Sequence, residues 1–128
     1  MNTAYLCVLL AAVMPILLAG AAKFGGVRKG VLYDNSAPRE SLSRLEGWPQ
    51  RANWAQQNSW EAFMVFVAAV LVAVQSGQPS AVVGVWAAVF IVARLGYAVC
   101  YLLNLASLRS IFWLAGFGIC LRLMASAI

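Results

Sequence analysis

Four long apolar runs are the feature that most constrains how this chain can fold. They cover residues 3–24, 53–75, 80–103 and 107–127. Each run reaches the roughly 20 residues that a helix needs to cross about 30 Å of hydrocarbon. Backbone groups in lipid must bond within their own segment, and no alternating β-barrel pattern is present. The sequence therefore predicts an all-α integral membrane protein, a bundle of four transmembrane helices in a single domain (1–128) with one long loop at 25–50.

The composition supports a membrane protein and narrows its chemistry. Of 128 residues, 63% are hydrophobic and only 10% are charged, whereas a soluble domain has roughly a quarter charged residues. This excludes a water-soluble domain or a disordered chain, and it argues against nucleic acid as a partner despite the net charge of +5. The sequence has no His, which removes the commonest metal ligand and general base. The three Cys have no metal-ligand spacing, so no metal site is predicted.

The first apolar run has a second interpretation as a secretory signal peptide. It ends in the small residues 19–22, which resemble a cleavage site. However, residues 1–5 carry no positive charge, and the run is longer than a typical signal-peptide core. We therefore expect a retained helix.

The basic residues predict the topology. The long loop and its edges hold Lys23, Arg28, Arg39 and other bases, and Arg109 follows the short third loop. Lys and Arg concentrate in cytoplasmic loops. We therefore expect both of these loops in the cytoplasm and both termini outside it, with Arg122 as a single opposing charge. Within the long loop, residues 41–47 are expected to form a short helix.

Polar side chains inside the apolar runs predict a layer near the cytoplasmic half of the bundle. Asn58 and Glu61 share one helix face, and Arg94, Tyr97 and Tyr101 share another. One interpretation is structural, with a Glu61–Arg94 ion pair and Asn58 joining helices through hydrogen bonds. The other is a charged pocket for an anionic ligand, because the planar fork of Arg pairs with carboxylates. Arg51 fits either a charge at the membrane surface or a ligand contact.

These residues resemble a known family. The segment from Arg51 to Phe63, which contains Asn58 and Glu61, is similar to the signature of the MAPEG proteins, the membrane-associated proteins in eicosanoid and glutathione metabolism. Downstream, Arg94, Tyr97 and Tyr101 and then the pair Arg109-Ser110 fit the same pattern. The upstream pieces 34–35, 38–39 and 45–48 look like its bacterial branch, and the resemblance covers nearly the whole chain.

The resemblance implies a homotrimer in a bacterial inner membrane, with glutathione as co-substrate bound between neighbouring protomers. It implies that Asn58 and Glu61 hold the glutathione backbone, with Glu61 at its α-amino group. Arg109 and Ser110 would be the catalytic pair beside the thiol, where a donor stabilises the thiolate. Lys23 or Arg28 is expected at a carboxylate of the tripeptide. The full predicted cofactor-binding set is Asn58, Glu61, Arg94, Tyr97, Tyr101 and Arg51.

Three positions depart from the family pattern. Trp54 stands where many members have Arg, Gln57 where a basic residue is common, and Trp113 where a Tyr is expected. Losing one buried partner of a charged ligand group costs about 2–5 kcal/mol. The first hypothesis, which the resemblance implies, is a glutathione-dependent transferase or peroxidase that acts on lipophilic electrophiles or lipid hydroperoxides. The three departures favour the alternative, a non-catalytic MAPEG-fold protein that binds a lipid or another anionic ligand.

A third hypothesis is a small four-helix drug exporter with one essential membrane carboxylate. Such exporters place that carboxylate in the first helix. The first run of this chain contains no acid, which argues against this class.

Overall fold

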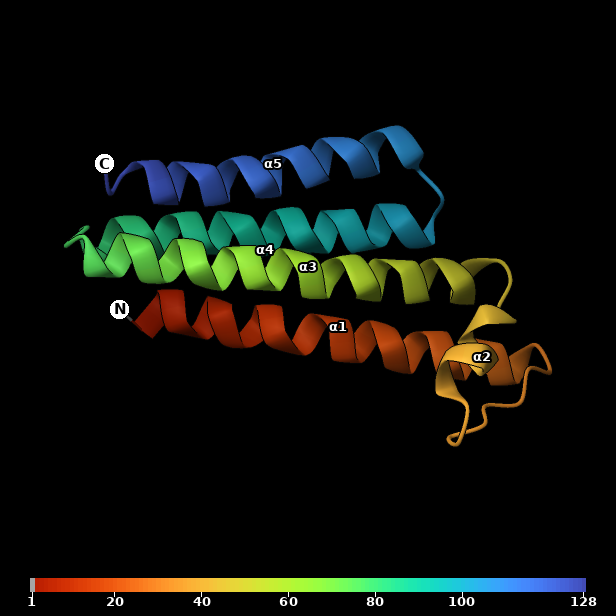
Figure 1. The fold of residues 1–128 in the computed structure, drawn as a ribbon. Coiled ribbons are helices and arrows are strands. Elements are labelled where there is room, and N and C mark those ends of the chain that lie inside the picture. Colours follow the sequence, from red (N-terminus) through yellow and green to blue (C-terminus); the bar gives the residue numbers. More distant parts are fainter. Residues whose placement is uncertain (1) are drawn as a thin grey trace.

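The computed structural model describes residues 2–128, with side chains from Thr3 onward, and it is helical throughout its regular parts. Figure 1 shows the four long helices lying side by side, with one short helix near an end. The four long helices are all long and apolar enough to cross a membrane, and no strand occurs in residues 2–128. The predicted fold class of a four-helix integral membrane protein is confirmed. The elements are α1 (Asn2–Arg28), α2 (Pro38–Ser43), α3 (Trp48–Gln75), α4 (Ser80–Leu102) and α5 (Ala106–Ala125).

The long helices alternate in direction, with α3 and α4 between α1 and α5 (Figure 1). Both termini and the α3–α4 turn lie at one end of the bundle, which we call the terminal end. The helix α2, the α1–α3 connection and the α4–α5 turn lie at the opposite end, which we call the loop end. The two connections predicted to share one side of the membrane therefore do lie on one side of the molecule.

A close-packed core joins the helices in the middle of the bundle. The rings of Phe66 on α3 and Phe90 on α4 stack with centroids 3.9 Å apart, and both side chains are buried. Many large apolar side chains point outward instead, among them Leu17 at 66% exposure and Val92 at 65%. A water-soluble monomer rarely exposes such large apolar patches. The outer surface is therefore suited to lipid.

Two helices extend further at the loop end than the apolar runs indicated. The helix α1 continues to Arg28, and α3 begins at Trp48 rather than at 53. Pro49 lies in the first turn of α3, where the missing N–H of proline costs nothing. At 28 residues, α3 is about 42 Å long. It is therefore longer than the hydrocarbon core of a bilayer.

The short loop helix lies at Pro38–Ser43 rather than at 41–47. Proline at its first position favours a start there. Gly47 has a positive φ of 67°, a left-handed conformation that no helical residue adopts. The predicted segment therefore ends outside any helix.

Candidate functional site

Asn58 on α3 connects the buried guanidinium of Arg94 on α4 to the exposed carboxylate of Glu61, which lies one turn further along α3. The Arg94 Nη2 atom donates to Asn58 Oδ1 at 3.0 Å, and Asn58 Nδ2 donates to Glu61 Oε2 at 3.1 Å. The predicted ion pair between Arg94 and Glu61 is not formed, since the only ion pair among the described residues is Arg44–Glu40. Asn58 carries both a donor and an acceptor. It therefore bridges two groups of opposite charge that do not touch.

Arg94 is the most enclosed charged group of this cluster. Its side chain is only 4% exposed, although it belongs to a helix that could span the membrane. A second bond runs from its Nη2 to Ser59 Oγ at 3.3 Å. The Ser59 hydroxyl in turn donates to the Ala55 carbonyl at 2.7 Å. Hydrogen bonds of this kind offset part of the cost of burying a charge.

A row of aromatic rings and guanidinium groups runs from Arg94 towards the loop end. The Arg94 Cζ atom lies 4.0 Å from the centre of the Tyr97 ring. The rings of Tyr97 and Tyr101 meet edge to face at 5.6 Å, and Arg109 Cζ lies 4.4 Å from the Tyr101 ring. Guanidinium groups at such distances are attracted to the faces of aromatic rings. This row places Arg109 of α5 against α4.

Two hollows adjoin this row. The first, which we call the inner cavity, has a volume of about 140 Å³ and lies among α3, α4 and α5. Its polar side is formed by Asn58, Glu61 and Arg94, and the rest of its lining is mostly apolar. The second, which we call the α4–α5 groove, holds about 420 Å³ and is lined by Tyr97, Tyr101, Arg109, Ser110, Trp113 and Leu114.

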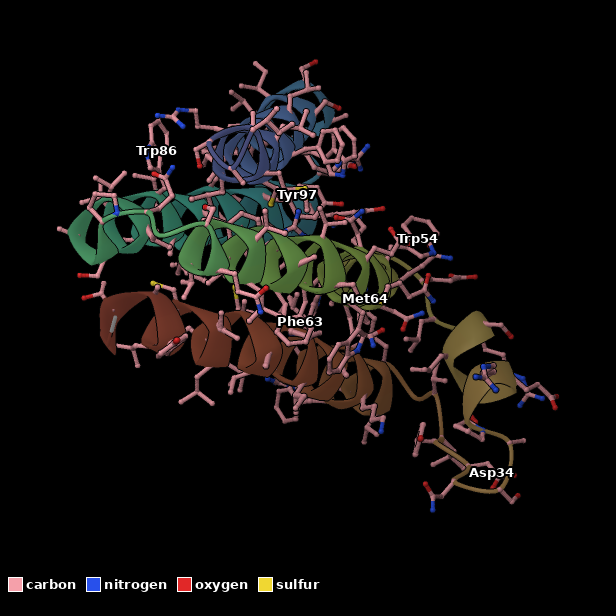
Figure 2. All side chains as sticks on the ribbon, turned by 60° about the vertical axis from the view of Figure 1, so that its left-hand side comes forward. Asp34, Trp54, Phe63, Met64, Trp86 and Tyr97 are labelled. Carbon is pink, nitrogen blue, oxygen red and sulfur yellow. The ribbon has the colours of Figure 1, made fainter. Side chains whose placement is uncertain are left out.

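Trp113 belongs to the lining of both hollows. Its ring stacks on Phe117 with centroids 5.4 Å apart, and it is 39% exposed. Figure 2 shows Tyr97 on the side of α4 that faces α5. Seven of the eight predicted site residues therefore line one of two hollows that meet at Trp113.

Arg51 is the predicted site residue that lies apart. Its Nε and Nη2 atoms donate to the Leu102 carbonyl at 3.2 and 3.1 Å. Leu102 is the last residue of α4, where helix carbonyls lack partners and cations are favoured. Arg51 thus fastens the start of α3 to the end of α4.

The two bases of α1 that the resemblance points to contact aromatic rings. Lys23 Nζ lies 4.3 Å from the centre of the Tyr33 ring, and Arg28 Cζ lies 5.7 Å from the Phe24 ring. Neither lines the inner cavity or the α4–α5 groove.

Sequence reasoning missed Ser59 and Cys120. Ser59 bonds Arg94 directly, and Cys120 lines the inner cavity with its side chain buried. Ser59 is the only serine within the apolar run 53–75, and it directly follows Asn58. Its position beside Asn58 could therefore have predicted a role in the polar cluster. The sequence does not predict a role for Cys120, because a buried cysteine most often behaves as a small apolar residue.

These features define a class: an integral, multi-pass membrane protein whose four helices enclose a polar cluster towards the loop end. The sequence of residues 3–128 matches the model of the MAPEG family, and the chain belongs to that family. The resemblance seen in its motifs is confirmed over essentially the whole chain. A search of curated proteins found no significant match.

Proposed function

We propose that this protein is a glutathione-dependent transferase or peroxidase acting on lipophilic electrophiles or lipid hydroperoxides. One observation supports this most strongly. The residues that the family motif assigns to the tripeptide, Asn58 and Glu61, and those that it assigns to the thiol, Arg109 and Ser110, line two hollows that share Trp113. Residues from three helices thus surround one region.

The proposed roles follow from the chemistry of each side chain. The Glu61 carboxylate is exposed and would receive the glutathione α-amino group, while Asn58 would bond its backbone. Tyr97 and Tyr101 would line the tripeptide from α4. Arg109 and Ser110 would stabilise the thiolate, which is the nucleophile. The thiolate would attack an electrophilic carbon of a substrate that enters from the bilayer; the C–S bond of a thioether would form as the bond to a leaving group on that carbon breaks, and the leaving group would depart with the bonding electron pair. With a lipid hydroperoxide, the thiolate would attack the terminal oxygen, the O–O bond would break to give the lipid alcohol after protonation, and a second glutathione would convert the resulting sulfenic acid to glutathione disulfide and water.

A homotrimer in a bacterial inner membrane completes this proposal. Glu61 is exposed although it lies on a membrane-spanning helix, and a charge facing lipid is costly. A neighbouring protomer would cover it and close the site. With the basic loop end in the cytoplasm, the site would open towards cytosolic glutathione.

Trp113 favours a second candidate function, a non-catalytic protein that binds a lipid or another anionic ligand. Its ring lies between the two hollows, where the family pattern has a tyrosine hydroxyl. Trp54 and Gln57 likewise bring no charge to the site. Absence of saturable glutathione binding, together with saturable stabilisation of the protein by an anionic lipid, would support this candidate.

The proposal is tested by glutathione binding to the detergent-purified protein, measured by thermal shift and calorimetry. Saturable stabilisation at millimolar glutathione is expected. The variant Arg109→Gln should bind about tenfold more weakly, since it removes a charged hydrogen-bond donor. The matched control is Arg122→Gln, because Arg122 also lies on α5 over an aromatic ring, Trp86, but near the terminal end. No shift up to about 10 mM glutathione, or equal losses in both variants, would contradict the proposal.

A further inference from the structure

A second, much smaller cavity adjoins Arg94 among α1, α3 and α4; we call it the small cavity. Its volume is about 10 Å³. A cavity needs about 10–15 Å³ to hold one water molecule, so the small cavity suits one water and no larger ligand. It is lined by Ala11 and Met14 from α1, Ser59, Ala62 and Phe63 from α3, and Phe90 and Arg94 from α4. Figure 2 shows Phe63 on the side of α3 that faces α1.

Pro15 removes a backbone hydrogen bond from the middle of α1. It lies inside the helix, and its side chain is fully buried. Proline has no backbone N–H, so the Ala11 carbonyl lacks the donor that the residue four positions later would supply, and the proline ring crowds this carbonyl. No side chain among the described residues donates to the Ala11 carbonyl. Membrane helices tolerate an internal proline where ordered water or a neighbouring helix satisfies the freed carbonyl.

The freed carbonyl lies at the small cavity. In an α-helix the carbonyl of a residue points along the axis towards the residues three and four positions later, which here are Met14 and Pro15. Ala11 and Met14 both line the small cavity, and Ala11 is buried. The α1 wall of the small cavity therefore presents a hydrogen-bond acceptor that has lost its helical donor.

Arg94 and Ser59 supply polar groups from the other helices. Both hydrogen bonds that Arg94 forms with the described residues use Nη2, so the N–H groups of Nε and Nη1 remain for other partners. The Ser59 hydroxyl donates to the Ala55 carbonyl, and its oxygen has two lone pairs to accept with. A guanidinium can only donate and a carbonyl can only accept. Water does both, and it therefore suits a cavity that has donors on one wall and an acceptor on another.

We propose that the small cavity is a binding site for one water molecule that joins α1 to the polar cluster. The water would accept from Arg94, donate to the Ala11 carbonyl and direct its second O–H at Ser59 Oγ. Three hydrogen bonds are the usual number for a buried water. The bridge would continue a chain that already runs from Glu61 through Asn58 to Arg94. It goes beyond the proposed reaction, because neither the water nor its partners on α1 require bound glutathione.

The proposal is tested by X-ray radiolysis of the detergent-purified full chain without glutathione, followed by mass spectrometry. Radiation converts bound water into hydroxyl radicals, which oxidise the nearest side chains, and methionine is readily oxidised. A scavenger in the bulk solvent should lower the oxidation of the exposed Met64 but not that of Met14. Equal suppression at both methionines would show that bulk solvent reaches Met14, which would overturn the proposal.

Two variants change the site in different ways. Ala11→Val adds two methyl groups to the lining and should abolish the scavenger-resistant oxidation of Met14. Pro15→Ala returns an N–H to the Ala11 carbonyl and removes one hydrogen bond from the water. Labelled oxygen from bulk H₂¹⁸O should therefore appear in oxidised Met14 about fivefold sooner. Pro15→Ala keeps the test decisive if Ala11→Val does not fold, because alanine favours a helix.

The matched control is Pro49→Ala, which also replaces a fully buried proline. Pro49 lies in the first turn of α3, where the missing N–H interrupts no helical bond, so the exchange measured at Met14 should not change. Equal acceleration in both proline variants would show a general loosening of the bundle and would overturn the proposal. Unchanged exchange in Pro15→Ala, or persistent oxidation of Met14 in Ala11→Val, would also overturn it. Failure of glutathione to bind leaves these measurements unaffected, so the two proposals succeed or fail separately.

Discussion

At the scale of single residues, Asn58 is the side chain on which the polar cluster depends. It accepts from Arg94 and donates to Glu61. Asn58→Ala should lower the free energy of unfolding by about 1–2 kcal/mol, because Arg94 would keep only Ser59 as its partner. The measurement is unfolding in mixed micelles, followed by circular dichroism. Gln57→Ala is the control, since Gln57 is an exposed amide that makes no side-chain hydrogen bond with the described residues. Equal effects of the two substitutions would contradict this bridging role.

Trp113 is the residue at which the proposed reaction can be improved. If glutathione lies in the α4–α5 groove, Trp113→Tyr adds a hydroxyl near the thiol and should raise the conjugation rate about tenfold. The rate is measured with a lipophilic electrophile at saturating glutathione. Phe117→Tyr is the matched control, because Phe117 stacks on Trp113 but lines only the inner cavity. An equal gain in both variants would argue against a specific position for the hydroxyl.

The residue patterns predicted which side chains share a helix face but not how they pair between helices. The spacing of Asn58 and Glu61, and of Arg94, Tyr97 and Tyr101, was enough to place them in one layer. Whether Arg94 contacts Glu61 or Asn58 depends on how α3 is rotated about its axis relative to α4. The periodicity of a single helix does not predict this rotation. The same limit applies to Arg51, whose partner is a backbone carbonyl of α4. The binding and catalytic roles themselves stay predictions.

At the scale of elements, the first residues of α3 pack tightly against α1 at Gly25, near the loop end. A Cβ atom added at Gly25 would lie 2.7 Å from Pro49 Cγ and would also overlap the Trp48 ring. Gly25→Ala should therefore destabilise the bundle by about 1–3 kcal/mol, the usual cost of overpacking. Gly20→Ala on the same helix is the control, because a Cβ there meets nothing within 4 Å. Melting temperatures of the two variants in one detergent provide the test, and similar values would contradict this account of the contact.

The α1–α3 connection should respond to acid through Asp34. The Ser36 hydroxyl and backbone N–H bond Asp34 Oδ1 at 2.6 and 2.8 Å, and these bonds hold the pKa of the carboxyl below its ordinary value. Because the pKa of Asp34 is lower in the folded state, its ionised carboxylate stabilises the folded connection at pH values above the unfolded pKa of about 4. This stabilisation is lost as the pH falls through the folded pKa. The protection of the amides of residues 34–37 against hydrogen exchange, corrected for the intrinsic pH dependence of the exchange rate, should therefore fall below about pH 4. Asn35→Ala, which changes no charge, is the control and should show the same fall. In Asp34→Ala this acid-dependent loss of protection should disappear; its persistence would assign the effect to another group.

The element boundaries show where hydropathy alone is insufficient. Apolar runs located all four spans, but they missed the polar first turns of α3. Residues 48–52 are not apolar as a group, yet they are helical because Pro49 suits a helix start and Arg51 bonds the end of α4. The short helix α2 was misplaced for a related reason. Its start depends on Pro38, and the positive φ of Gly47 keeps the end of the predicted segment 41–47 out of a helix. Apolar periodicity describes neither feature.

At the scale of the whole molecule, the charge difference between the two ends predicts its orientation in the membrane. The loop end holds seven of the nine basic residues, and the terminal end holds Arg122. Because Lys and Arg are retained on the cytoplasmic side, the loop end should face the cytoplasm and both termini should lie outside it. The short α4–α5 loop supports the same orientation. Arg109 follows this loop, which lies at the same end of the bundle as the basic α1–α3 connection.

Labelling of single introduced cysteines in spheroplasts tests this orientation. The natural cysteines Cys7, Cys100 and Cys120 are buried, so a membrane-impermeant maleimide should leave the unmodified protein unlabelled. Ile128→Cys, at a fully exposed position, should be labelled in intact spheroplasts. Asn35→Cys, also exposed, should be labelled only after permeabilisation. The reverse pattern would place the proposed site on the side away from cytosolic glutathione, and the proposed reaction would then lack its co-substrate.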